Sequence, residues 1–184
     1  MKTVVLPASL LVKMRRKAED VCAMFEHRVG VYGHNKVERT VKAWFSEYAV
    51  RQCYREGGVD AHQNIKDLKA PDLTIPSHST LNESFETRQE EVKCWTTGYS
   101  WNEYGGTITE YHATEYARKE RARVWFCEVD LVSLTVVIHG WATPAEILES
   151  KTRITSSGCN HQVEVMHKIS EVMGWIEEDK DGWF

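Results

Sequence analysis

The spacing of apolar residues predicts two amphipathic helices in the first third of the chain. Over residues 8–29, apolar side chains recur every three or four positions, and this pattern stops near Gly30. A second helix is expected to begin at Asn35, whose side chain suits an N-terminal cap, and to end before Gly57 and Gly58. The apolar face of this second helix is formed by Val37, Val41, Trp44, Phe45, Tyr48, Val50 and Cys53.

Two apolar runs further along predict a β-hairpin. The run DLTI, residues 72–75, lies between Pro71 and Pro76, and prolines of this kind fix the ends of a strand. Turn-forming residues over 77–84 lead to a second strand, FETRQEEVKCWT, over 85–96. Because the two legs of a hairpin lie one strand spacing apart, residues from the two runs are expected to meet.

The rest of the chain alternates between helical and extended patterns. The expected elements are an aromatic-rich loop over 97–106, a helix over 107–122, strands over 123–131 and 133–142, and a short helix over 143–150 capped by Thr143. After Lys151, the segment 159–176 favours a strand followed by a helix. This order predicts the α/β (α+β) class, with a mixed central sheet flanked by helices. We expect a single domain over 1–184.

Composition narrows the range of functions. The chain has 184 residues, 42% of them hydrophobic, which is enough for one sizeable core. Its net charge of −4 disfavours a generally basic protein that coats nucleic acid, although basic residues cluster over 13–17 and 118–123. Five cysteines without a CxxC pair favour reduced thiols, and no stretch reaches membrane-spanning length or resembles a signal peptide. The sequence therefore predicts a cytoplasmic protein without a membrane partner.

Charged and apolar residues alternate in the second strand of the hairpin. Glu91 and Lys93 share one face of this strand, whereas Val92 points to the other. Glu90 has the opposite parity from Lys93, so Glu91 is the expected partner of the lysine. If the two runs pair, Asp72 lies near Glu91, and two carboxylates and an ammonium group meet in one place.

This grouping suits phosphodiester hydrolysis. Asp72, Glu91 and the main-chain carbonyl of Val92 would offer hard oxygen ligands to Mg²⁺ or Mn²⁺. The metal would lower the pKa of a bound water and polarise the phosphate. Lys93 would stabilise the negative charge that develops on the phosphoryl oxygens. The alternative is a surface hairpin whose Glu and Lys residues have no catalytic role.

The segments PDLTI and EVK resemble the two halves of the motif of the PD-(D/E)XK nuclease superfamily, which includes restriction enzymes and phage exonucleases. The resemblance covers roughly residues 33–142, framed by the helix over 8–29 and a C-terminal extension over 143–184, and it implies a restriction-endonuclease-like α-β-β-β-α-β core. It also implies a Mg²⁺-dependent deoxyribonuclease that acts on DNA, with catalytic and metal-binding roles for Asp72 and Glu91, Val92 as a main-chain metal ligand, and Lys93 as the motif lysine.

Glu38, on the second helix, is similar to the upstream glutamate that often completes the metal shell in this superfamily. The same residue also fits a solvated first turn of a helix, where its charge interacts favourably with the helix dipole. On the expected helix over 107–122, three charged or polar side chains share a face that approaches the phosphate or lies in solvent: His112, Glu115 and Lys119.

Other functions remain open at this point. A nucleic-acid-binding module that kept the fold and lost the reaction would carry the same motif, and so would a phage-type interaction or inhibitor protein whose hairpin charges lie at the surface. Members of the superfamily often work as dimers, which implies a homodimer as one assembly, although nothing in the sequence marks a dimer surface.

Two further groups of residues have a binding and a structural interpretation. Three loop aromatics could stack on bases or pin their loop to the core: Tyr99, Trp101 and Tyr104. Three potential zinc ligands lack a second pair at ligand spacing, so a core cysteine and surface histidines are expected: Cys159, His161 and His167.

Overall fold

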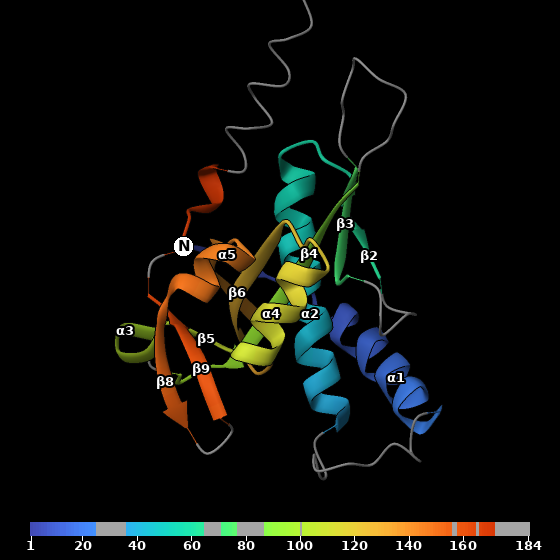
Figure 1. The fold of residues 1–184 in the computed structure, drawn as a ribbon. Coiled ribbons are helices and arrows are strands. Elements are labelled where there is room, and N and C mark those ends of the chain that lie inside the picture. The colour runs from blue at the N-terminus through green and yellow to red at the C-terminus, as the bar shows by residue number, and fades with distance from the viewer. Residues whose placement is uncertain are drawn as a thin grey trace, which may run out of the picture.

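The computed structural model describes residues 1–24, 36–64, 71–76, 87–99, 101–155, 158–164 and 166–171. In this part of the chain, a mixed six-stranded sheet carries helices on both faces, and a smaller three-stranded sheet packs beside it (Figure 1). The expected α/β class with a mixed sheet is therefore confirmed.

The helices are α1 (Ala8–Met24), α2 (Lys36–Glu56), α3 (Trp101–Tyr104), α4 (Glu110–Arg118) and α5 (Pro144–Glu149). The strands are β1 (Lys2–Val5), β2 (His62–Gln63), β3 (Leu73–Pro76), β4 (Thr87–Thr96), β5 (Gly106–Thr109), β6 (Arg123–Asp130), β7 (Thr135–Ala142), β8 (Lys151–Thr155) and β9 (Gly158–Val163). None of the helices in the described residues is long and apolar enough to cross a membrane.

The large sheet has the strand order β1-β7-β6-β4-β3-β2, and the small sheet has the order β5-β9-β8. Strands β4 and β6 are parallel, whereas β3 and β4 form the expected antiparallel hairpin, with Leu73 opposite Glu90 and Pro76 opposite Thr87. The turn over 77–84 lies outside the described residues. Since β3 begins at Leu73, the part of β4 after Glu90 extends beyond the segment that pairs with β3.

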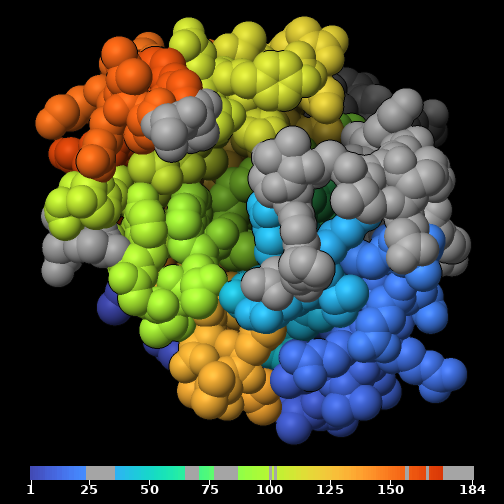
Figure 2. Space-filling view, turned by 90° about the horizontal axis from the view of Figure 1, so that it is seen from below, coloured from blue at the N-terminus to red at the C-terminus, as the bar shows by residue number. Residues whose placement is uncertain are grey.

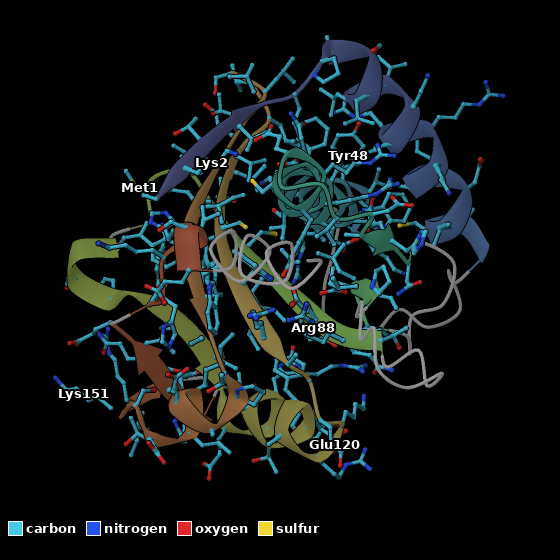
Figure 3. The ribbon with its side chains drawn as sticks, turned by 90° about the horizontal axis from the view of Figure 1, so that it is seen from above. Met1, Lys2, Tyr48, Arg88, Glu120 and Lys151 are labelled. Atoms are coloured by element: carbon cyan, nitrogen blue, oxygen red, sulfur yellow. The ribbon has the colours of Figure 1, made fainter. Side chains whose placement is uncertain are left out.

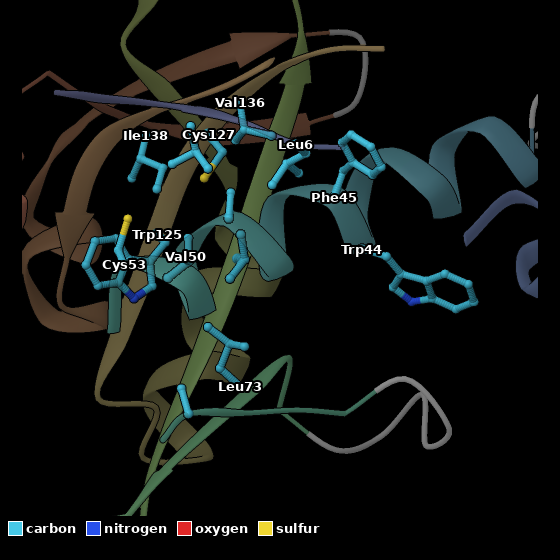
Figure 4. Close-up of a cluster of buried hydrophobic side chains, with 14 of the residues drawn as sticks. Leu6, Trp44, Phe45, Val50, Cys53, Leu73, Trp125, Cys127, Val136 and Ile138 are labelled. Carbon is cyan, nitrogen blue, oxygen red and sulfur yellow. The ribbon is translucent and has the colours of Figure 1, made fainter. Parts of the chain in front are cut away.

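The main core lies between the large sheet and the pair α1 and α2. The apolar face of α2 supplies Phe45 and Val50 to this core, which also contains Trp125 and Ile138 of the sheet (Figure 4). The expected second helix is confirmed, with its first residue at Lys36. The first helix begins at residue 8 as expected, and the predicted residues 25–29 lie outside the described part of the chain.

A second core lies on the opposite face of the large sheet, beneath α4, α5 and the small sheet (Figure 3). Neighbouring residues of β6 supply both cores, because successive side chains of a strand point to opposite faces. Trp125 belongs to the main core, and Phe126 packs with Ile108 and Ile147 in the second. The fold thus has three layers, with the large sheet in the middle.

The expected helix over 107–122 is wrong in its first part. Thr107, Ile108 and Thr109 belong to β5, which pairs with β9, and α4 starts only at Glu110. The Thr109 side chain accepts a hydrogen bond from the main-chain N–H of His112 and caps the helix. Three residues in a row that suit a strand, followed by a capping threonine, account for this boundary.

The expected short helix is confirmed as α5. Thr143 is its N-cap and forms a capping box with Glu146, with Pro144 in the first turn. Four elements were expected neither as a helix nor as a strand, namely β1, β2, α3 and β8. Strands β1 and β8 bury few side chains, so neither shows the alternation by which a strand is usually detected.

Candidate functional site

Asp72 lies immediately before β3, where this strand parts from β4. Its Oδ2 accepts a hydrogen bond of 2.7 Å from the main-chain N–H of Val92. Continuing the register from the Leu73–Glu90 pair places Asp72 opposite Glu91. The N–H and C=O groups of one strand residue point to the same edge, so the carbonyl of Val92 also faces the edge that β3 leaves open.

Lys93 brings a positive charge to both carboxylates. Its Nζ lies 3.8 Å from Oδ2 of Asp72 and 3.5 Å from Oε2 of Glu91, and 5.2 Å from the ring centroid of Tyr116 on α4. Burial by itself would lower the pKa of the Lys93 ammonium group, but Asp72, Tyr116 and Glu91 together outweigh this effect and the pKa is raised. Lys93 is therefore a fixed cation at neutral pH.

Glu91 is held by a second cation, Arg121, which follows α4. The Nε atom of Arg121 donates a hydrogen bond of 2.8 Å to Oε1 of Glu91, and its Nη1 donates to the Gln89 side chain. Burial and the charge of Asp72 raise the pKa of the Glu91 carboxyl group. Both oxygens of Glu91 thus face a cation, Arg121 on one side and Lys93 on the other.

Glu47 of α2 is a third carboxylate at this site, and it was not predicted. Its residue is only 5% exposed, and its Oε2 accepts a hydrogen bond of 2.8 Å from Nε2 of Gln63. Burial, and then the charge of Asp72, raise the pKa of Glu47 to about 8. A signal was present in the sequence: Glu47 lies three residues from both Trp44 and Val50, so it falls on the apolar face of the helix.

Glu38 does not join these residues. It lies in the first turn of α2 and is paired with Lys42 at 2.7 Å, with a half-exposed side chain. Glu38 precedes Glu47 by nine residues, which is about 2.5 helical turns, so the two carboxylates leave opposite sides of α2. The structure therefore places Glu38 where the solvated-turn interpretation expects it.

Glu90 points to the other face of β4, as its parity requires. The side chain is fully buried in the main core. It accepts hydrogen bonds from the Tyr54 hydroxyl at 2.8 and 2.7 Å, from Nη1 of Arg123 at 2.7 Å and from Nε1 of Trp125 at 2.6 Å. Such a fully bonded carboxylate stabilises the packing of α2 on the sheet and has no room for a ligand.

The helix α4 brings two of its polar side chains toward different partners. His112 stacks on Tyr116, with 6.0 Å between the ring centroids, and its Nδ1 lies 2.9 Å from Oγ1 of Thr109. Glu115 forms ion pairs with Arg118 at 2.9 Å and with Lys119 at 3.8 Å. Tyr116 therefore lies between His112 and Lys93, whereas Glu115 and Lys119 form a charged outer face.

The loop aromatics pack on one another. Tyr99 stacks on Trp95 at 5.7 Å, and Trp101 stacks on His139 at 3.8 Å between ring centroids. This arrangement matches the interpretation that these rings hold their segment to the core. Trp95 lies two residues beyond Lys93 on the same face of β4, so this cluster adjoins the candidate site.

The three potential zinc ligands have other surroundings. His167 contacts two carboxylates, with Nε2 2.6 Å from Glu146 and Nδ1 2.8 Å from Glu171. His161 is buried in β9, so the expectation of a surface histidine was wrong for this residue. Cys159 is partly buried, and all five cysteines of the chain are free thiols.

The donor set around Asp72 suits a hard divalent cation. Glu47, Asp72 and Glu91 supply carboxylate oxygens, and Val92 supplies a main-chain carbonyl at the open edge. The raised pKa values of Glu47 and Glu91 indicate an excess of buried negative charge, which a cation would relieve. Within the described residues, however, no three His, Cys, Asp or Glu side chains converge as a ready-made metal site. The carboxylate of Glu91 is turned to Arg121 instead.

The chain matches no protein-family model and no curated protein. The contacts around Asp72, Glu91 and Lys93 are therefore the basis for a function.

Proposed function

We propose that the chain is a metal-dependent nuclease that hydrolyses phosphodiester bonds of DNA through a PD-(D/E)XK site. The observation that carries this proposal is the meeting of Asp72, Glu91 and Lys93 within 4 Å contacts at the open edge of β4. Two carboxylates and a lysine from the two legs of the hairpin converge there in a partly buried position, which a solvated hairpin face does not require.

The order of elements supports a restriction-endonuclease-like core. Helix α2 precedes the hairpin β3–β4, α4 follows it, and β6 then returns parallel to β4. A parallel neighbour needs a crossover connection, and α4 lies within that connection, over the face that carries Glu91 and Lys93. The chain thus places its charged residues between the sheet and a helix.

Glu47, Asp72 and Glu91, with the carbonyl of Val92, would hold Mg²⁺ or Mn²⁺. Bound there, the ion supplies a Lewis acid for the scissile phosphate and lowers the pKa of a water ligand. Lys93 contributes a cation whose charge is secured by Asp72 and whose position is limited by Tyr116, so it stabilises negative charge on phosphoryl oxygens without reorganisation. Burial and the charge of Asp72 raise the pKa of Glu47 to about 8, and a bound cation would favour its ionised form as a ligand.

The test is cleavage of linear, circular, nicked and branched DNA by the purified chain with Mg²⁺ or Mn²⁺. Asp72→Ala and Lys93→Ala are expected to abolish cleavage, and Glu38→Gln is the control that leaves it unchanged. Absence of cleavage on every substrate, or cleavage that survives both active-site substitutions, would contradict the proposal.

One contact favours a second function, a nucleic-acid-binding module without catalysis. The ion pair between Arg121 and Glu91 takes a carboxylate that the metal would need. The module would bind DNA equally well with Mg²⁺ and with a chelator, and it would not cleave. In the nuclease, by contrast, Mg²⁺ raises the melting temperature of the chain, and Asp72→Ala removes this rise.

A further inference from the structure

The β8–β9 hairpin presents two cations that have no acidic partner among the described residues. All five residues of β8 are exposed, and β8 is the edge strand of the small sheet in the described residues. Lys151 and Arg153 form no ion pair with any carboxylate in the described part of the chain. Figure 3 shows Lys151 at the rim of the molecule. Arg118 and Lys119, by contrast, pair with Glu115.

Arg153 is held in place by an aromatic ring. The carbon of its guanidinium group lies 4.6 Å from the ring centroid of Tyr104, which belongs to α3. A guanidinium group that lies over an aromatic ring still has N–H donors available to an anion. The side chain therefore loses less conformational freedom on binding than an unsupported arginine does.

The composition of the hairpin indicates which partner it fits. Residues 150–163 contain no Asp or Glu, in a chain whose net charge is −4. The hydroxyl group of Thr152 lies between the two cations in the sequence, whereas those of Ser150 and Thr155 are hydrogen-bonded within the chain. Lysine, arginine, serine and threonine are the residues that contact phosphates and sugars of nucleic acids.

The hairpin lies on the same side of the large sheet as the candidate site. Lys93 faces Tyr116 of α4, and β9 packs with α4 in the second core through Val163. In Figure 2 the orange to red segment with this hairpin lies beside α4, and α1 lies at the opposite corner. A nucleic acid that passes the candidate site can therefore continue over the hairpin.

We propose that the β8–β9 hairpin is a nucleic-acid contact surface in which Lys151 and Arg153 bind backbone phosphates. The inference rests on the proposed nuclease function for its substrate. It adds a surface that binds the nucleic acid beyond the reacting phosphate.

The test is the affinity of full-length Lys93→Ala protein for labelled single-stranded and duplex DNA, measured by fluorescence anisotropy over a range of salt concentrations with Mg²⁺ present. Adding Lys151→Ala and Arg153→Ala should lower the affinity about tenfold at low salt. The slope of log affinity against log salt should fall by about 1.8 for duplex and about 1.4 for single strands, since two phosphate contacts are lost.

The matched control is the pair Lys13→Ala and Lys17→Ala on α1, which removes the same charge at the opposite corner. Equal losses in both double variants would show a general charge effect and overturn the proposal. If Ile154→Thr lowers the DNA affinity and leaves the salt slope unchanged, the hairpin contacts a protein partner and the proposal is overturned. Self-association that depends on β8 would overturn it in the same way.

Cleavage by the same hairpin variants in an active background separates this proposal from the nuclease function. If both hold, the hairpin variants keep kcat and raise KM. DNA binding through the hairpin without cleavage by the wild-type chain would refute only the nuclease function. Cleavage and binding that are both unaffected by the hairpin substitutions would refute only this inference.

Discussion

Asp72 accepts a hydrogen bond from the main-chain N–H of Val92, which lies 20 residues later and next to two candidate site residues. The bond orients the Asp72 carboxylate toward β4, and Nζ of Lys93 lies 3.8 Å from the same oxygen. The aspartate therefore has a structural role as an acceptor and a proposed chemical role as an anion, and substitutions can separate the two.

Asp72→Asn is expected to keep the fold and lose cleavage. The side-chain oxygen of asparagine still accepts the N–H of Val92, but the negative charge beside Lys93 is gone. Asp72→Ala leaves this N–H without an acceptor, which costs about 1–3 kcal/mol of the free energy of unfolding. Urea unfolding and DNA cleavage of the two variants measure these effects. Equal cleavage by Asp72→Asn and wild type would contradict a role for the charge.

Glu47→Gln should stabilise the metal-free protein, and more at pH 8 than at pH 5. The pKa of Glu47 is raised from 4.5 to about 8 in the folded state, so between these values the folded chain binds more protons than the unfolded chain. Stability of the wild type therefore falls as pH rises through this window, by at most about 1.4 kcal/mol per pH unit from this group. Melting temperatures of both proteins at pH 5, 6.5 and 8 provide the measurement.

The matched control for this prediction is Glu38→Gln on the same helix. The pKa of Glu38 is lowered by its hydrogen bond and ion pair with Lys42, so its removal gives no gain at pH 8. If Glu47 is a metal ligand, Mg²⁺ at pH 8 should raise the melting temperature of the wild type and of Glu38→Gln but not of Glu47→Gln. If the difference in melting temperature between wild type and Glu47→Gln does not change with pH, burial and Asp72 do not raise the pKa of Glu47.

Part of the fold and of the candidate site can be predicted from regular patterns in the sequence. Strand parity separates Glu90 from Glu91 because the side-chain period of a strand is two, and a one-residue error would move each side chain to the wrong face. The hairpin and α2 are predictable for the same reason, since their apolar patterns are regular over many residues.

The apolar pattern of a helix does not show which of its glutamates lies beside a strand that starts 17 residues after the helix ends at Glu56. Glu38 was proposed as a site residue because of the family resemblance. Glu47 lies at the site because of the packing angle of α2 and its hydrogen bond with Gln63 of β2, which are tertiary features. Strand β1 was not predicted because its partner β7 is distant in the chain, and β8 was not predicted because it buries none of its side chains.

Arg121→Ala is expected to destabilise the metal-free protein. Arg121 and Glu91 form a buried pair, with side chains only 5% and 10% exposed, so removal of the arginine leaves a buried carboxylate with Lys93 alone. Breaking such a pair costs about 3 kcal/mol. Urea unfolding measures the loss, and Arg118→Ala is the exposed control that should leave the free energy of unfolding unchanged.

The same variant distinguishes the two proposed functions. When Arg121 is absent, Glu91 is free to turn toward a cation, so Mg²⁺ should stabilise Arg121→Ala more than it stabilises the wild type. No effect of Mg²⁺ on either protein would favour the binding module, in which the Arg121–Glu91 pair is a permanent structural contact.

His167 is expected to make the attachment of residues 166–171 depend on pH. The main chains of His167 and Trp141 exchange two hydrogen bonds, of 2.8 and 3.2 Å, and the imidazole stacks on the Trp141 ring at 4.3 Å. Both ring nitrogens face carboxylates, Glu146 and Glu171, and can donate to both only in the imidazolium form. These hydrogen bonds raise the pKa of His167 above 6.5.

A histidine with a raised pKa stabilises the folded state fully below its unfolded value of 6.5 and loses this contribution as pH rises through the folded value. Protection of the Trp141 amide against hydrogen exchange should therefore fall between pH 6 and pH 9, relative to the Ile138 amide in the interior of β7. In His167→Ala the Trp141 amide should exchange faster, with a protection ratio to Ile138 that no longer changes with pH. A ratio that falls with pH as steeply in His167→Ala as in the wild type would assign the pH dependence to another group.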